Sequence, residues 1–503
     1  MIILGLWRLI FFAAKRTVSK SDRIVLGCIL LVGLLFGLVL YPSFFGWEYD
    51  NYSNFLMARR FIPTYWHGMY TGVLYAGCLA VLPHPIALFL FQWLSFWAVV
   101  SYLYLGIGRL YGNGIRKYLV LLLFLLPESY YVTYNPYRNN MYTILVLFYF
   151  SYLYFSAKRA DGIAGLKEIL FFSLLTSFVM VWRSEGILLG LGGIVVYLFF
   201  VLELPQKKHV KPAAVLLVAA SVFFLVFSRI QALGEKKYYG RDYMIINTTN
   251  ILGNILNCPW ADLSYAGAED DLRAIDAIVP TEIVRACGAE GYRSYNWTNG
   301  RTDYNQTLAP DSQAAAYMSA YCRIVLHNLD LFFGTQTNHF FQALQLPANH
   351  PTYPYEGDLR ISLAFLEDFP LRVGREELRE TWFTSRWENN EKRIMLVNLA
   401  AGLIGLWRGL VEQSGLNRLM HTAALLLPAI LFLLELLRVI DGKKRFRDSA
   451  AYMLSFLVIL GECGAILLVM PEGRPAYLYP MLYAAYLMIF LCFAERPVPE
   501  KSR

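Results

Sequence analysis

Arg183 and Glu185 interrupt an otherwise apolar stretch of the chain, FVMVWRSEGILLGLGG. Ionisable residues at the ends of membrane helices are costly to keep, and they often mark a ligand site or a polar pathway. Similar charged groups stand beside other apolar stretches, namely Glu48, Asp50, Glu128, Arg138 and Arg474. Carboxylates and arginines from segments this far apart in the sequence would form one active site if they met at one membrane face.

These residue types divide into two kinds of chemistry. A carboxylate can act as a general base, which is worth typically about 10²–10⁴-fold in rate when it is well positioned. A guanidinium group binds phosphate through two parallel hydrogen bonds and keeps its charge in a partly dry site. We therefore predict Asp50 as the catalytic base and Glu48 as a second site carboxylate. The alternative for Asp50 is a solvated loop residue or a helix cap.

Composition places the chain in a membrane. It is 57% hydrophobic and 16% charged, with a mean hydropathy of +0.42, which excludes a soluble globule of 503 residues. Ten stretches have about the length that a helix needs to cross the hydrocarbon. The sequence thus predicts an all-α polytopic membrane protein with spans at 24–40, 86–107, 118–134, 141–157, 168–182, 186–204, 212–228, 419–437, 449–470 and 476–494, of which the third and fifth are short or interrupted.

The distribution of basic residues predicts the orientation, because Lys and Arg resist translocation. If both termini are cytoplasmic, the inner segments hold most of these residues, including the cluster at 443–447. The short outer segments then hold only Arg59, Arg60, Arg138, Arg183 and Arg474. We expect a multi-pass protein of a bacterial inner membrane. The net charge of +8 reflects this bias and predicts no nucleic-acid binding.

The chain divides into four parts by polarity. Residues 1–23 are predicted to be a cytoplasmic interfacial segment, and residues 24–228 a seven-span module whose first outer loop is 43–85. Residues 229–418 are of mixed polarity, with helical stretches near 268–288 and 313–346, and are expected to form a mostly helical extracytoplasmic cap. Three further spans and a cytoplasmic tail occupy 419–503. The apolar stretch 394–412 is interpreted as an interfacial helix; as a span, it would place the 443–447 cluster outside.

This arrangement resembles the GT-C glycosyltransferases, which take a sugar from a polyprenyl-phosphate donor. The sequence WEYDNY at 47–52 is similar to the acidic motif that this superfamily carries outside its first span. Arg183-Ser184-Glu185-Gly186 is similar to its Arg-x-x-Gly, and Arg474 is similar to its arginine before a final span. The sequence PYRNN at 136–140 departs from the pattern, because many relatives have an acidic residue there.

The resemblance implies an inverting transfer to a cell-envelope glycan, lipid or protein on the extracytoplasmic side. Asp50 would activate the acceptor hydroxyl, with Glu48 beside it. The donor phosphate would be bound by Arg183, Arg474 and Arg138, with Glu128 and Glu185 as neighbouring site residues. The carboxylates at Glu48 and Asp50 would permit a divalent metal ion, although the chemistry does not demand one.

Each charged residue also has a structural alternative. Arg183 could anchor a span end at the lipid interface, with Glu185 as its counter-ion. Glu128 and Arg138 bracket an outer hairpin and could pair with each other. For Glu462, which lies deeper within a predicted span, we favour a structural hydrogen bond over a catalytic role.

Two other functions remain open. A polysaccharide polymerase or ligase that uses a lipid-diphosphate oligosaccharide would also combine many spans with outer arginines, but it would lack the acidic motif after the first span. A transporter or flippase would be expected to show internal repeats and broken helices with polar groups near the midplane. The charges of this chain gather at one face instead, which favours the transferase.

Overall fold

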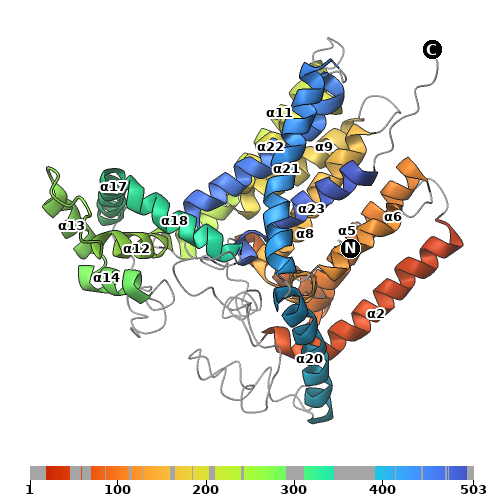
Figure 1. Cartoon of the computed structure of the whole chain (residues 1–503), viewed down its shortest axis with the longest axis horizontal. Helices are drawn as coiled ribbons and strands as arrows, with labels where there is room; N and C mark the ends of the chain where they lie inside the picture. Colours follow the sequence, from red (N-terminus) through yellow and green to blue (C-terminus); the bar gives the residue numbers. More distant parts are fainter. Residues whose placement is uncertain are drawn as a thin grey trace.

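The protein is helical throughout the part of the chain that the structure describes. The computed structural model describes residues 18–45, 58, 69–84, 86–112, 116–126, 128–158, 165–183, 185–202, 210–238, 243–290, 311–344, 391–413, 415–442, 446–470, 473 and 475–494. Within these ranges every regular element is a helix and there is no β-strand. Figure 1 shows a large bundle of long helices with a smaller group of helices at one side.

Long apolar helices confirm that the chain is a membrane protein. In the described ranges, five helices have the length and hydropathy needed to cross a bilayer. Two of them, α11 and α21, bury only 17% of their most apolar window inside the protein, so most of that surface is left for lipid. The five helices are α2 (Lys20–Phe45), α5 (Ile86–Tyr111), α11 (Val210–Tyr238), α21 (Leu416–Ile440) and α22 (Phe446–Val469).

Shorter helices form the centre of the bundle. They are α8 (Arg138–Ala157), α9 (Leu166–Trp182), α10 (Gly186–Phe200) and α23 (Tyr479–Ala494). Helix α8 packs against α23, and α9 packs against α10 and α11. Aromatic stacking joins the first three, because the Phe172 ring lies 5.6 Å from that of Tyr149 and 4.1 Å from that of Tyr197. These side chains are buried, as expected for helices enclosed by other helices.

The predicted span at 118–134 is broken into pieces. Helix α6 (Arg116–Leu119) leads into the 3₁₀ helix η1 (Val120–Leu125), and α7 (Ser129–Tyr134) follows after a turn. The sequence has Pro127 at this break, and proline ends a helix because it lacks a backbone N–H and clashes with the preceding turn. The turn places Glu128 at the start of α7.

The smaller group of helices has its own hydrophobic core, around Ile255, Ile275, Val284 and Tyr317. The helical stretches predicted near 268–288 and 313–346 are present, but each is divided in two. We call this group the helical module. It comprises α12 (Tyr243–Leu256), α13 (Ala268–Asp276), α14 (Thr281–Glu290), α17 (Asp311–His327) and α18 (Leu329–Ala343).

Helix α18 joins the helical module to the bundle. The Gln336 side chain donates a hydrogen bond of 3.0 Å to the carbonyl of Leu468 near the end of α22. Gly473, after α22, packs so closely on α18 that a Cβ there would lie 2.3 Å from the side chain of Gln342. The segment that leads into α23 is therefore held against the module, on the side where α22 ends.

Two further apolar helices lie outside the five spans. Helix α4 (Met69–Val81) has 13 residues, fewer than a helix needs to cross the hydrocarbon. Helix α20 (Glu391–Gln413) buries Val397 and Ala401 while Leu399 and Leu403 are more than 60% exposed. Its apolar segment, Met395–Trp407, is shorter than a span. An exposed leucine face of this kind fits the predicted interfacial helix.

Candidate functional site

Arg183 lies in the tight turn between two central helices. Helix α9 ends at Trp182 and α10 begins at Gly186, so the charged residues occupy the connection between two apolar segments. The turn depends on Gly186, because a Cβ there would lie 2.2 Å from the carbonyl oxygen of Val179 and 2.7 Å from the hydroxyl of Tyr142. Only glycine allows the two helices to approach each other at this point.

The Arg183 side chain is buried and has two protein partners. One terminal nitrogen donates to the side-chain oxygen of Asn139, in the first turn of α8. The other forms an ion pair with Glu185, whose side chain is only 7% exposed. The expected counter-ion relation between Glu185 and Arg183 is thus confirmed.

Arg138 is brought to the same place from the start of α8. Its terminal nitrogen donates a hydrogen bond of 2.8 Å to the carbonyl of Trp182, and the Trp182 ring nitrogen donates one of 3.3 Å back to the carbonyl of Arg138. These two bonds join the beginning of α8 to the end of α9. Two of the predicted phosphate-binding arginines therefore lie beside one another.

The turn before α23 reaches Arg183 as well. The 3₁₀ helix η4 (Pro475–Tyr477) directly follows position 474. The Arg183 guanidinium lies 5.4 Å from the ring centroid of Tyr477 and 5.8 Å from that of Tyr142. Segments nearly three hundred residues apart in the sequence therefore meet at Arg183, and one of them is the segment that carries Arg474.

Two polar groups beneath these arginines are buried without a hydrogen-bond partner. Both carboxylate oxygens of Glu462, on α22, and the hydroxyl of Tyr142, on α8, lack a partner in the part of the chain that the structure describes. Each lies within electrostatic range of the Arg183–Glu185 pair. The structural hydrogen bond expected for Glu462 is therefore wrong, because no donor of the described helices faces its carboxylate.

Glu128 belongs to a different buried pair. Its carboxylate contacts Nε2 of His421, on α21, and Nδ1 of the same ring lies 3.3 Å from the carbonyl of Leu344, after α18. Glu128 and His421 are both at most 1% exposed. This pair ties the α7 turn to α21 and to the end of the helical module, so Glu128 has a partner that sequence reasoning did not suggest.

The predicted site residues therefore have three outcomes. Arg138, Arg183 and Glu185 lie together, whereas Glu128 lies in the His421 pair. Glu48, Asp50 and Arg474 fall outside the described residues, and their roles stay predictions.

Several residues of this region were missed by sequence reasoning. Tyr142 follows Arg138 by four residues and follows Asn139 by three on α8, and these spacings could have suggested a shared helix face. Tyr477 and His421 carry no comparable signal, because only the folded helices bring them to the charged residues.

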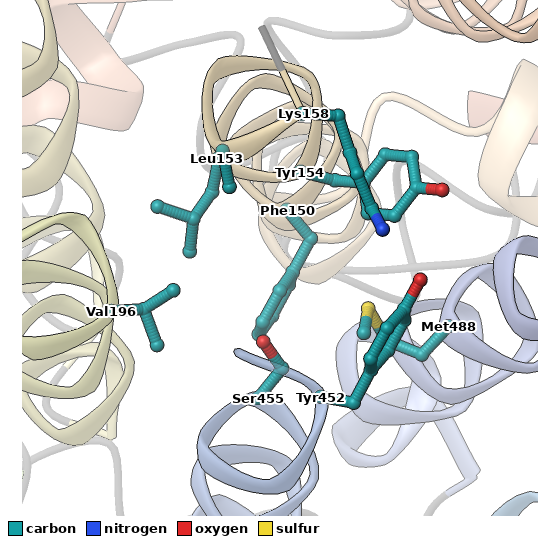
Figure 2. Close-up of a pocket in the computed structure, with 9 residues that line it drawn as sticks. Phe150, Leu153, Tyr154, Lys158, Val196, Tyr452, Ser455 and Met488 are labelled. Atoms are coloured by element: carbon teal, nitrogen blue, oxygen red, sulfur yellow. The ribbon is translucent and has the colours of Figure 1, made fainter. Parts of the chain in front are cut away.

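A second polar feature lies at the opposite end of α8, roughly 30 Å from Arg138 at the rise of a helix. Figure 2 shows Lys158, Tyr154 and Tyr452 around a small cavity between helices α8, α10, α22 and α23. The Lys158 ammonium group lies 5.2 Å from the ring centroid of Tyr452. The cavity volume is about 30 Å³, which is enough for water but not for a sugar phosphate. We take the Arg183 region as the candidate site because Arg138, Arg183 and Glu185 lie together there.

No known protein family matches this chain, and neither a curated protein nor a solved structure is similar to it. Among the described residues, no group of histidine, cysteine and carboxylate side chains has the arrangement of a metal site. The class that fold and composition define is a helical membrane protein, and any finer assignment has to be argued from the polar residues around Arg183.

Proposed function

We propose that this protein is an integral membrane glycosyltransferase of the GT-C type, which moves a sugar from a polyprenyl-phosphate donor to a cell-envelope acceptor. One observation supports this proposal above all. The start of α8, the α9–α10 turn and the turn before α23 come together at Arg183, and all three carry an arginine. Arginines gathered from separate helix ends suit a phosphate headgroup whose lipid tail lies in the bilayer.

The burial of this cluster strengthens the argument. Arg183 is 8% exposed, and a cation in a partly dry site interacts with an oxyanion more strongly than it would in water. The departing phosphate carries the charge that the arginines would stabilise, so no acid is needed to protonate it. The general base, Asp50 in this proposal, would act on the acceptor hydroxyl from the other side of the sugar.

The proposal includes the topology. Helices α8, α9, α10 and α23 and the broken segment at 116–134 would cross the membrane in addition to the five long helices, giving ten crossings. Both termini would be cytoplasmic, and the helical module would be the extracytoplasmic cap. The contacts of α18 with Leu468 and Gly473 support a cap at the same end of the bundle as Arg183.

A transfer assay tests the proposal directly. Purified protein in proteoliposomes should release polyprenyl phosphate from radiolabelled polyprenyl-phosphate hexoses and pass the label to an envelope-lipid extract. Arg183→Lys should lower this rate by at least about tenfold, because an ammonium group keeps the charge but loses the two-pronged bond to phosphate. Arg438→Lys is the matched control, since Arg438 pairs with Glu435 in the last turn of α21.

The outcome also separates the alternatives. Transfer from the monophosphate donor that depends on Arg183 supports the proposal. Activity only with a lipid-diphosphate oligosaccharide would replace it with the polymerase or ligase. Movement of lipid-linked sugar across the bilayer without any chemical change would replace it with the flippase.

A further inference from the structure

Glu462 and Tyr142 differ from most of the other buried polar groups of the central helices, and unlike the Tyr486 hydroxyl on α23, which also lacks a partner in the described part of the chain, they lie near the Arg183–Glu185 pair. Most of those groups are satisfied within the bundle: Thr143 donates to the carbonyl of Asn139 at 2.9 Å, and the hydroxyl of Tyr149 lies 3.4 Å from the carbonyl of Gly190. Buried polar side chains in proteins nearly always have such partners. Glu462, at 0% exposure, and Tyr142, at 1%, have none among the described residues.

Charge balance does not explain the carboxylate. Arg183 already has Glu185 as its counter-ion and Asn139 as a second acceptor. A further carboxylate in the same apolar surroundings adds a desolvation cost that no ion pair of the described helices offsets. Ionisable groups kept inside membrane bundles at such a cost usually serve a ligand.

The positions of the two groups suggest which part of a ligand they would meet. Glu462 lies on α22, seven positions before its last residue, or roughly 10 Å deeper than the helix end at the rise of a helix. Tyr142 lies one turn beyond Arg138 on α8, and its hydroxyl faces Gly186 of the Arg183 turn. Both groups thus lie deeper in the bundle than the arginines, where the charge of the phosphate would be buried away from its guanidinium partners at a high cost.

We propose that Glu462 and Tyr142 bind the sugar of the donor through its hydroxyl groups, while the arginines hold the phosphate. This inference rests on the proposed function and adds the part of the site that reads the sugar. A carboxyl group and a phenol together offer both donors and acceptors, which is the combination that neighbouring hydroxyl groups of a sugar require. A bare lipid phosphate would leave both groups without partners.

Binding measurements with and without the sugar test this inference. The probes are polyprenyl phosphate and the polyprenyl-phosphate derivatives of glucose, mannose and galactose, with affinities measured on the full-length protein in nanodiscs. Wild-type protein should bind at least one of the sugar-bearing carriers about tenfold or more tightly than the bare carrier. Glu462→Gln and Tyr142→Phe should each remove most of this difference while leaving the affinity for the bare carrier unchanged.

Tyr149→Phe is the matched control. It removes a buried hydroxyl from the same helix, but one that is satisfied inside the bundle, so the sugar-dependent difference should persist. Variants of Glu462 and Tyr142 that keep the wild-type difference would overturn the inference and point to ordered water as their partner. Variants that lower the affinity for the bare carrier and for the sugar-bearing carriers equally would also overturn the inference, because that pattern shows a structural role.

Failure of the proposed function would look different. Wild-type protein would then bind none of the four lipids, or Arg183→Lys would leave binding of the bare carrier unchanged. The sugar inference fails by itself when the bare carrier binds through Arg183 and either the wild type shows no sugar-dependent difference or the variants of Glu462 and Tyr142 do not affect that difference.

Discussion

At the scale of single residues, Arg183 is held in place before any ligand binds. Asn139 and Glu185 accept from its two terminal nitrogens, and two aromatic rings lie within 6 Å of its guanidinium group. An arginine fixed in this way has lost most of its side-chain freedom, so less entropy is lost when it binds phosphate. A phosphate would compete with Glu185 for the guanidinium, which makes the Arg183–Glu185 pair the element most directly altered by donor binding.

Asp50 provides the test of the base assignment. If Asp50 activates the acceptor hydroxyl, Asp50→Asn should keep folding and donor binding but lower turnover by about a hundredfold or more. Single-turnover kinetics with bound donor would measure the chemical step separately from binding. Turnover within a few fold of wild type would remove Asp50 from the mechanism.

At the scale of elements, the α9–α10 turn positions the cluster. The hairpin brings two apolar helices together so closely that the first residue of α10 has no room for a side chain. The same close approach places Arg183 and Glu185 under the start of α8. Side-chain contacts at such a crossing depend on packing in three dimensions, which explains why the sequence suggested an Arg-x-x-Gly motif but not its partners Asn139 and Tyr142.

Gly186→Ala should therefore disturb the site through the backbone. The added Cβ would meet the carbonyl of Val179, so one of the two helices has to shift, and we expect a loss of about 1–3 kcal/mol of stability. Apparent melting temperatures in detergent would measure this effect. Gly464→Ala is the control, because its Cβ meets nothing within 4 Å and alanine favours a helix; equal melting temperatures for the two variants would contradict the packing argument.

The helical module contains an acid-sensitive ion pair. Hydrogen bonds from Arg323, together with one from Tyr265, lower the pKa of Asp271 below its ordinary value of 3.8, although burial opposes this shift. The lowered pKa stabilises the folded state at pH values above about 4, the ordinary pKa of an Asp in the unfolded chain. This stabilisation is lost as the pH falls through the lower pKa of Asp271 in the folded state.

Hydrogen exchange in α13 and α17 should therefore increase below about pH 4 in the wild type. In Asp271→Asn the contribution of this ion pair to the stability of the folded module should be absent at every pH. Asp270→Asn is the control, because the Asp270–Arg273 pair is more than 70% exposed and should have little effect. An acid response in Asp271→Asn equal to that of the wild type would contradict the assignment.

At the scale of the whole molecule, the sequence predicted the helical membrane class, and it predicted the helical stretches in 268–288 and 313–346. These predictions follow from local hydropathy and periodicity. The sequence also predicted that the third span, 118–134, is short or interrupted, which agrees with its division into α6, η1 and α7. It did not predict the pairing of Glu128 with His421. That pairing joins residues almost three hundred positions apart, and no local pattern carries it.

The orientation of the whole molecule can be tested by cysteine labelling in a background without native cysteines. A membrane-impermeant maleimide added from outside should label Asp270→Cys in the helical module and should not label Asp441→Cys, which follows α21; both positions are exposed in the structure. Labelling of position 441 from outside, without labelling of 270, would reverse the proposed topology. Permeabilised cells provide the control in which both positions react.

The most direct test of the central claim is to locate the bound lipid phosphate. A polyprenyl phosphate with a photoreactive group next to its phosphate, cross-linked to the full-length protein, should label peptides that contain 138–142, 183–186 and 473–477, and Arg183→Lys should reduce this labelling. Cross-links confined to the opposite end of α8, around Lys158 and Tyr452, or labelling that does not respond to Arg183→Lys, would contradict the proposed phosphate site.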